Sequence, residues 1–426
     1  MSTLPETRYI RFRRLSIFLL YALAFLAPLG VLSRALTATA ETLSSGVFLL
    51  PGPTTLIIII LVAYGFFSSA IPSYLNRVRI WYYLFFFTII AFFAGLFHPD
   101  YLNACIRAVM FCVYMSLMLY LIILNLSQKE MLNLVLSAAL GMALMLFLSL
   151  IDYFGIYNIP LVNERSFSVK VEDQGLRIKT LSGPFRSRSE MSAFLSVILP
   201  VSFGYLFMPG TKKIPRFLIC IALVMGIFCV IVGGSRTMYL ALIGSFFYVA
   251  WNAIRKRYFG KIVIFIPFLI AGIAVILIRN TDYLFLFISR FGEMSYEKVF
   301  YSDGDMIRWY ALVETAKELV FKPWGLGFTQ FKYFGRFWDV HSIFTEFIRA
   351  SGIIGIILLS LFGIKVFKKH VYASKRSPFV FVFFSGFIGF LIYNIGHSYW
   401  QVSVLWLFMG CYFIEVFNRR HAPNFR

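Results

Sequence analysis

Long runs of hydrophobic residues, separated by short polar connections, recur from one end of the chain to the other. A helix needs about 20 mostly apolar residues to cross the hydrocarbon core of a bilayer, so these runs predict about twelve membrane-spanning helices. The pattern therefore predicts an all-α integral membrane protein that forms a single polytopic domain over residues 1–426. The expected spans are 15–32, 54–71, 80–97, 108–126, 131–152, 191–208, 217–233, 238–252, 262–278, 351–367, 378–396 and 402–417.

The composition supports this interpretation. Apolar residues make up 60% of the chain and charged residues only 14%, and 50 of the 426 residues are Phe. A soluble domain has roughly 45–50% apolar and about 25% charged residues. The basic start of the chain precedes a long apolar run without a small-residue cleavage pattern, so it is expected to be a first anchor and not a removable signal peptide. The five cysteines all lie in apolar runs, and no disulfide framework is expected.

The net charge of +21 is distributed very unevenly among the connections. Alternate short connections, together with both chain ends, hold 22 of the 40 Lys and Arg residues. The short connections on the other side contain almost no basic residue except Arg34 and Arg236. This is the positive-inside pattern, and it places both termini in the cytoplasm. The excess charge is therefore expected to orient the protein and to contact anionic lipid, and it does not indicate a nucleic-acid partner.

Two longer segments, 153–190 and 279–350, both follow odd-numbered spans and are expected to lie outside the cytoplasm. The second is predicted to be partly helical over 305–320, with the helix ending before Pro323. Long loops escape the positive-inside rule, so their charges can be placed for chemistry.

The first candidate residues for chemistry are arginines on this outer side. Arg186 and Arg188 precede the sixth span and are expected either to form an entrance for an anionic lipid-linked substrate or to contact lipid phosphates. Arg236 lies in the tight Gly233–Thr237 turn, where a guanidinium could bind a phosphate through two parallel hydrogen bonds. The alternative is that Arg236 extends to the lipid headgroups.

The large loop contributes a third group, from Arg308 through an aromatic-rich stretch to His341. Nearby arginines would disfavour the imidazolium form of His341, and a neutral imidazole is what a general base near pH 7 requires. A single histidine is more often structural, and the aromatic residues can pack the loop or lie at the membrane interface instead of stacking on sugar rings.

The order of these motifs resembles the superfamily of O-antigen ligases and O-antigen polymerases. The resemblance covers about residues 180–360. It departs from many members at Arg188-Ser189-Glu190 and at Ser342, where asparagine-containing motifs are common, so the acceptor and the roles of Arg186, Arg188 and Glu190 stay open. The matching elements are Gly183-Pro184-Phe185, Ser235-Arg236, Arg308-Trp309, Pro323-Trp324-Gly325-Leu326-Gly327, His341 and Gly352-Ile353-Ile354-Gly355.

The resemblance implies a membrane glycosyltransferase with a GT-C-like fold in the bacterial inner membrane. Such an enzyme moves a glycan from undecaprenyl diphosphate to an acceptor glycan, either lipid A–core or a growing polysaccharide, at the periplasmic face without metal or another cofactor. Arg236 and Arg308 would match the diphosphate-binding arginines of the family, and His341 its proposed general base. Ligase activity is the favoured expectation and polymerase activity the alternative.

Two further classes of function remain open. A flippase for the same lipid-linked units would explain the many spans, but transporters usually carry ionisable residues at mid-membrane, and these spans have almost none at their centres. A passive assembly subunit would leave the arrangement of Arg236, Arg308 and His341 unexplained. The sequence shows no metal-ligand spacing in its loops and no Gly-rich nucleotide motif.

Overall fold

The computed structural model describes residues 6–28, 53–67, 81–156, 168–170, 177–179, 185, 188–233, 235–256, 303–329, 331–333, 336–338, 340 and 342–418. These residues form an all-α protein of 12 α-helices, with one π-helix and two short antiparallel hairpins. The helices are α1 (Glu6–Leu26), α3 (Pro53–Phe67), α5 (Trp81–Leu96), α6 (Tyr101–Leu124), α7 (Gln128–Tyr153), α8 (Arg188–Tyr205), α9 (Lys213–Gly233), α10 (Arg236–Arg255), α14 (Asp303–Phe321), α15 (Ile343–Arg376), α16 (Pro378–Tyr393), α17 (Ser403–Phe413) and η3 (Ile414–Asn418). The hairpins are β1 (Ser168–Lys170) with β2 (Arg177–Lys179) and β3 (Phe331–Tyr333) with β4 (Arg336–Trp338).

Five helices in the described part of the chain are long and apolar enough to cross a membrane: α6, α7, α9, α10 and α15. The protein is therefore a multi-pass membrane protein. A helix overlaps each expected span except 262–278, which lies outside the described residues. The predicted helix in the large loop is confirmed as α14, which ends two residues before Pro323.

The boundaries of α15 differ from the expected span 351–367, because the helix already begins at Ile343. The first turns of α15, which the expected span did not include, contain Glu346 and Arg349, and charged residues like these are typical of a loop. Both side chains are buried in ion pairs with other helices, and this allows polar residues to continue the helix.

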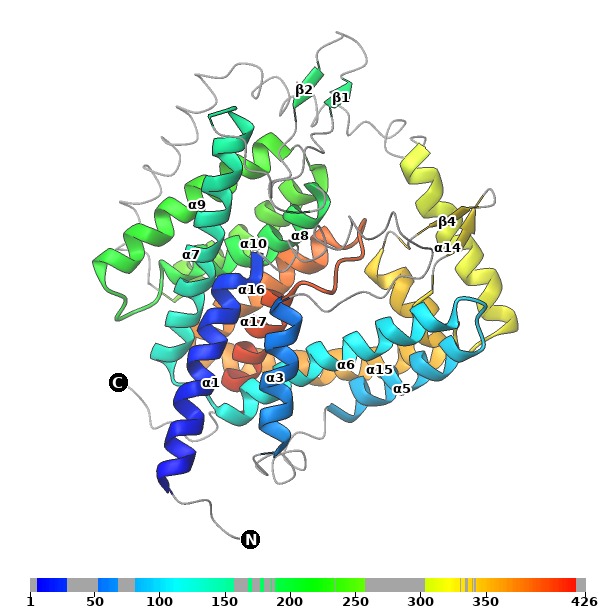
Figure 1. Cartoon of the computed structure of the whole chain (residues 1–426), viewed down its shortest axis with the longest axis horizontal. Coiled ribbons are helices and arrows are strands. Elements are labelled where there is room, and N and C mark those ends of the chain that lie inside the picture. Colours follow the sequence, from blue (N-terminus) through cyan, green and yellow to red (C-terminus); the bar gives the residue numbers. More distant parts are fainter. Residues whose placement is uncertain are drawn as a thin grey trace.

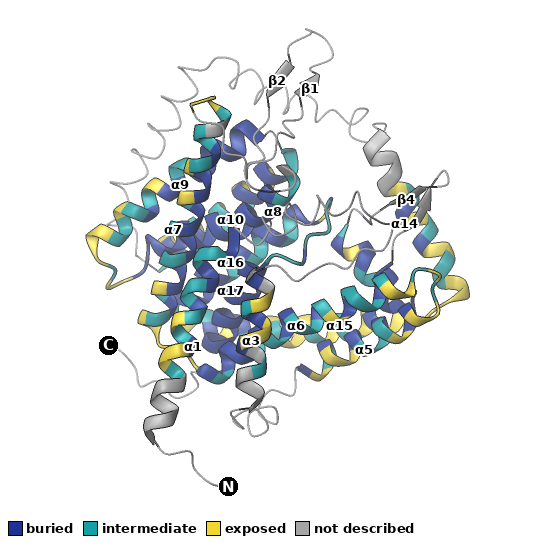
Figure 2. Ribbon diagram, viewed as in Figure 1, coloured by how far each residue is buried: buried dark blue, intermediate teal, exposed yellow. Residues whose placement is uncertain are grey.

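The centre of the bundle is α16, which packs against α8, α10 and α17 (Figure 1). Most residues of α8 and α16 are buried, as the dark blue ribbons in Figure 2 show. The two helices approach closely because α16 has no side chain at Gly386 and Gly389. A Cβ atom at Gly386 would lie 2.9 Å from the Val197 carbonyl oxygen, and one at Gly389 would collide with the Ser196 carbonyl oxygen. Small residues at helix contacts are typical of membrane bundles.

A second group consists of α5, α6 and α15, with α14 packed against α15 (Figure 1). Between the two groups, α17 contacts both α6 and α16. The helix α15 is interrupted at Gly352, whose φ of 63° and ψ of −156° are not helical. The chain therefore continues in a new direction after residue 352.

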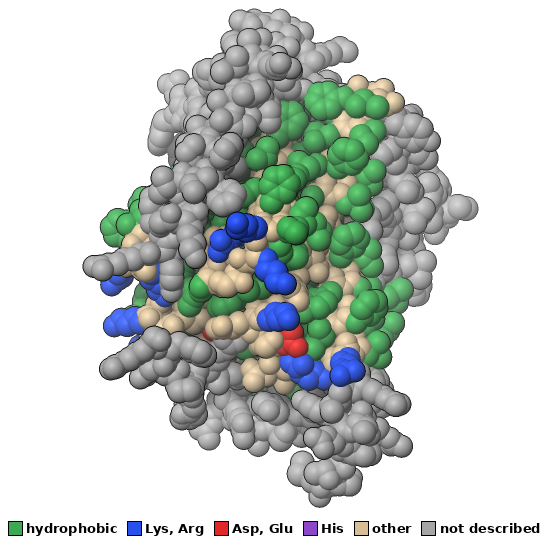
Figure 3. Space-filling model, turned by 90° about the vertical axis from the view of Figure 1, so that its left-hand side faces the viewer, with side chains coloured by type: hydrophobic (Ala, Val, Ile, Leu, Met, Phe, Trp, Pro, Cys, Tyr) green, Lys and Arg blue, Asp and Glu red, His purple; other side chains and the backbone are tan. Residues whose placement is uncertain are grey.

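The surface carries broad hydrophobic areas that a soluble protein would not leave exposed. Figure 3 shows one such face, with Lys and Arg side chains gathered below and beside a wide apolar area. Large exposed apolar side chains occur along several of the candidate spans, which is the surface that lipid covers. Examples are Phe147, Phe217, Ile243, Phe247 and Trp251.

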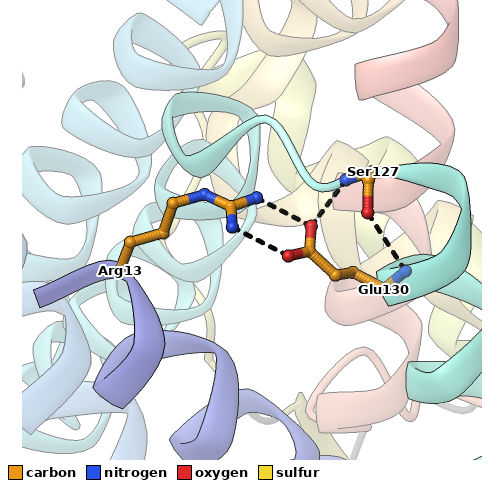
Figure 4. A network of polar contacts seen from close by, with 3 residues as sticks. All are labelled: Arg13, Ser127 and Glu130. Carbon is orange, nitrogen blue, oxygen red and sulfur yellow. Dashed lines mark hydrogen bonds and ion pairs between the residues drawn. The ribbon is translucent and has the colours of Figure 1, made fainter. Parts of the chain in front are cut away.

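The start of α7 shows how a charged residue is accommodated beside these apolar surfaces (Figure 4). The backbone N–H of Glu130 donates to the Ser127 hydroxyl at 3.3 Å, and the N–H of Ser127 donates to the Glu130 carboxylate at 2.7 Å. This reciprocal capping box satisfies two of the free N–H groups at the helix start. The Arg13 guanidinium donates to both carboxylate oxygens of Glu130, at 2.8 and 2.7 Å, and so joins α1 to α7.

Candidate functional site

The structure describes the five candidate residues to different extents. Arg236 is the first residue of α10 and is half-buried, as expected from the tight turn between α9 and α10. The backbones of Arg188 and Arg308 belong to α8 and α14, and their side chains lie outside the described part of the chain. Arg186 and His341 lie outside the described residues altogether.

The residues next to Arg188 and Arg236 meet at the end of α16. The Tyr393 hydroxyl donates a hydrogen bond to the Ser189 carbonyl oxygen at 2.7 Å. The side chains of Ser192 and Ser235 lie close to the same hydroxyl. Ser189 directly follows Arg188, and Ser235 directly precedes Arg236. The Tyr393 hydroxyl is therefore bonded to the first turn of α8 and lies close to the start of α10.

The chain that follows His341 is attached to the same place. The backbone N–H of Ile343 is shared between the carbonyl oxygens of Asn394, at 3.1 Å, and His397, at 2.9 Å. Ile343 is two residues after His341 in the sequence.

We call residues Tyr393–Gln401 the polar turn. Its conformation is fixed from within, because the Asn394 amide group donates to Phe390 O at 2.9 Å and accepts from Tyr399 N–H at 2.8 Å. The imidazole ring of His397 stacks on the Tyr393 ring, with centroids 4.6 Å apart and planes 13° from parallel. The His397 ring is half-buried.

His397 was not predicted from the sequence, because functional residues were expected only in the two long loops and in the Gly233–Thr237 turn. The sequence nevertheless contains a pattern that marks the polar turn. Asn394, His397, Ser398 and Gln401 form a dense polar stretch between two apolar runs, on the side where the positive-inside pattern places His341 and Arg236.

A buried ion pair joins the polar turn to α6. The Arg107 guanidinium lies 3.5 Å from a carboxylate oxygen of Glu346, whose side chain is only 2% exposed. The Ser398 hydroxyl donates to the other oxygen of this carboxylate. Because Ser398 follows His397 directly, Glu346 holds the polar turn against the first half of α15.

The Pro323–Thr329 segment and the Arg349–Ile353 segment pack together as a second feature, which we call the glycine junction. Leu326 N–H donates to Arg349 O at 2.8 Å, Gly327 N–H to Ala350 O at 3.1 Å, and Ile353 N–H to Pro323 O at 2.9 Å. These bonds satisfy backbone groups that the break at Gly352 removes from the helix.

A second ion pair, in which only the arginine is buried, closes the glycine junction. The Arg349 side chain, 2% exposed, donates from both terminal nitrogens to the Glu318 carboxylate of α14 and from Nε to the Thr329 hydroxyl at 3.2 Å. Arg308 lies ten residues before Glu318, about 15 Å further along the helix. The described contacts therefore bring the surroundings of Arg188, Arg236 and His341 together, but they do not bring Arg308 to the polar turn.

His98 lies in the turn between α5 and α6, close to the glycine junction. Burial and the positive charge of Arg349 lower the pKa of this imidazole, against the smaller opposing effect of Asp100. Its Nδ1 atom accepts a hydrogen bond from the Asp100 N–H at 3.1 Å, so in the neutral ring the proton is on Nε2.

Among the described residues, no group of three or more His, Cys, Asp or Glu side chains is arranged to hold a metal ion. The described cysteines are all free thiols. No protein-family model matches the chain, and no curated protein matches it significantly.

Proposed function

We propose that the protein is a membrane glycosyltransferase of the O-antigen ligase type. It would transfer a glycan from undecaprenyl diphosphate to an acceptor sugar at the outer face of the bacterial inner membrane. About twelve spans with both termini in the cytoplasm give the topology that this reaction requires. The observation that carries the proposal is that Ser189 and Ile343, close in sequence to Arg188 and His341, are bonded to one polar turn, and that Ser235, next to Arg236, lies close to it.

The chemistry follows from the residue types. The bond between the anomeric carbon of the glycan and the diphosphate breaks, and a bond from the acceptor oxygen to that carbon forms. The acceptor hydroxyl gives its proton to His341, and the leaving diphosphate keeps the electron pair. Arg236 and Arg308 stabilise the negative charge on that leaving group. A donor of this kind is worth about 2.7–4 kcal/mol, and a general base typically accelerates a reaction about 10²–10⁴-fold.

Replacement of His341 by Ala tests the base. The purified variant should transfer glycan at least about 100-fold more slowly than the parent protein. The assay uses a defined undecaprenyl-diphosphate-linked glycan and lipid A–core in detergent, with the product resolved by electrophoresis. His421→Ala, in the cytoplasmic tail of the proposed topology, is the matched control and should transfer normally. Full activity of His341→Ala would remove the proposed base.

Replacement of Arg236 by Met tests the diphosphate contact. The expected loss of rate is about 100- to 1,000-fold, the effect of one preorganised donor. Arg255→Met is the control, because Arg255 is the last residue of the same helix, α10. Equal rates for the two variants would contradict a role for Arg236 in binding the leaving group.

The same site supports polymerase activity if the acceptor is a second carrier-linked chain. Deletion of the gene distinguishes the two activities, because loss of a ligase leaves carrier-linked polymer and loss of a polymerase leaves single repeat units. A flippase is the alternative from another class. It would show no transfer in detergent, where no second membrane face exists.

A further inference from the structure

The helix α14 exposes an apolar face and buries a more polar one. Its exposed apolar residues recur every three or four positions, the spacing of one helix face. The most exposed are Val320, at 77%, and Phe321, at 81%. A helix of a soluble domain would present the opposite arrangement. The large residues of this apolar face, which continues into the turn after the helix, are Trp309, Leu312, Val313, Val320, Phe321 and Trp324.

The rotation of α14 about its own axis is fixed by contacts on the other side. Ala311 and Thr315 are buried there, and Glu318 forms the ion pair with the buried guanidinium of Arg349. The helix therefore cannot turn its apolar face towards α15 without separating two charges. The exposed face is a property of the docked helix.

The surroundings of α14 indicate what covers this face. Figure 1 shows α14 running crosswise to α5, α6 and α15, past the turn that joins α5 to α6. A helix that crosses the ends of spanning helices lies along the membrane surface. It is not among the candidate spans of the described residues, and it contains six charged residues within 19.

The apolar face of α14 is also continuous with a lipid-facing surface. The Pro323 carbonyl accepts from the Ile353 N–H at 2.9 Å, which places the end of α14 at the start of the second half of α15. That half exposes apolar side chains on a candidate span. At the other side of this junction, Phe97 in the α5–α6 turn and Leu102 at the start of α6 are exposed. Exposed apolar residues of the second half of α15 include Ile353, Ile354, Ile357, Leu361 and Ile364.

We infer that α14 is an interfacial helix whose apolar face is embedded in the outer leaflet of the lipid bilayer. Its tryptophans, Trp309 near the middle and Trp324 just after the end, are residues that favour the headgroup level. Lys317, on the same exposed side, can extend its ammonium group to the phosphates. The inference rests on contacts and exposure, and it holds whichever reaction the protein catalyses.

Spin labels in proteoliposomes of the full-length protein test this. Single cysteines are introduced at Leu312 and Val320 in a background without the five native cysteines, and collision rates are measured with oxygen and with a water-soluble nickel chelate. Oxygen should dominate at both positions, with a depth of about 5–10 Å below the headgroups. Phe247→Cys, on the exposed side of the candidate span α10, is the lipid control, and Lys212→Cys, exposed in the turn before α9, is the water control. Dominance of the nickel chelate at both positions would overturn the inference, and it is the result expected if another protein covers this face.

A second measurement avoids the cysteine-free background. Brominated phospholipids quench tryptophan fluorescence from within the bilayer. Compared with the parent protein, the double variant Trp309→Phe/Trp324→Phe should lose part of the quenched emission. An unchanged quenched fraction would contradict the placement of α14 in the lipid.

Discussion

The glycine junction and the polar turn both hold together segments that are far apart in the sequence, but by different means. In the glycine junction three backbone hydrogen bonds join the two segments, Gly325, Gly327 and Gly352 all have positive φ, and the Arg349–Glu318 ion pair closes the junction. In the polar turn side chains make more of the contacts, chiefly the Tyr393 hydroxyl and the stacked His397 ring, beside the backbone bonds from Ile343. The glycines of the first arrangement leave no room for a side chain, whereas the second depends on side chains.

This difference distinguishes residues that hold the fold together from residues that can take part in chemistry. The Pro323–Gly327 and Gly352 motifs fix how α14 meets α15 through backbone hydrogen bonds. The polar turn gathers groups that can donate, accept and stack beside Arg236. We therefore expect substitutions in the glycine junction to affect folding first, and substitutions in the polar turn to affect transfer first.

The largest effect is expected for Gly352→Ala. A Cβ atom at this residue would collide with the Pro323 carbonyl oxygen, in a backbone conformation that residues with a side chain rarely adopt. Strain and overpacking together cost about 2–6 kcal/mol. The variant should accumulate poorly and unfold at a much lower temperature in detergent. Gly363→Ala on the same helix has nothing within 4 Å and should resemble the parent protein. Equal stability of the two variants would show that the junction is not rigid.

The next effect concerns the ion pair of the same junction. Glu318→Ala leaves the buried Arg349 guanidinium without its carboxylate. Loss of one partner from a buried pair costs about 3–5 kcal/mol, and the cost here should lie at or below the lower end because the Glu318 side chain is 37% exposed to solvent. Adding Arg349→Met to this variant removes the uncompensated charge and should restore most of the stability. Thermal unfolding of the single and double variants gives the coupling. If the double variant is no more stable than Glu318→Ala, the ion pair is not what makes that substitution costly.

A smaller change in stability, with a larger change in function, is expected at the polar turn. Tyr393→Phe removes the hydroxyl that bonds to the Ser189 carbonyl oxygen of α8 and lies close to Ser235 of α10, at a cost of about 0.5–1.5 kcal/mol. Glycan transfer should fall by more than this stability loss explains, because the turn that carries Arg188 loses its bond to the polar turn. Tyr248→Phe removes a hydroxyl bonded to His370 and serves as the control. Equal transfer by both variants would break the distinction between the two regions.

The smallest effect is a dependence of stability on pH at the edge of the glycine junction. The pKa of His98 is lowered from its ordinary value of 6.5, chiefly by burial and then by Arg349. The unfolded chain therefore takes up a proton more readily than the folded one, and stability decreases as the pH falls below about 6.5. Asp100, Glu318 and Lys322 are the other charged groups near this ring.

His98→Asn keeps an acceptor for the Asp100 N–H and removes the titrating group. Unfolding temperatures between pH 8 and pH 5 should decrease less for this variant than for the parent protein. The same decrease in both proteins would assign the pH dependence to other groups.

Much of the fold could be predicted from the sequence, because a helix needs about 20 mostly apolar residues to cross the membrane and such runs can be recognised directly. The prediction of α14 was also correct, since Pro323 ends the helix by a local effect. The early start of α15 could not be predicted. A charged residue such as Glu346 is typical of a loop, and only the folded structure brings Arg107, from a distant helix, close enough to neutralise its charge.

The candidate site was predictable only in part. The turn before Arg236 was expected, and the structure confirms it. The association of Ser189, Ser235 and Ile343 with one turn depends on contacts between residues far apart in the chain, which no local pattern encodes. The roles of Arg236, Arg308 and His341 stay predictions.

The capping box of α7 has a consequence for biogenesis. Its carboxylate is synthesised 117 residues after the arginine that binds it. At about 5–20 residues per second, the ribosome needs roughly 6–23 s to produce this distance. The contact between α1 and α7 can therefore form only after this part of the chain has been made, whereas the contact of α1 with α3 can form earlier.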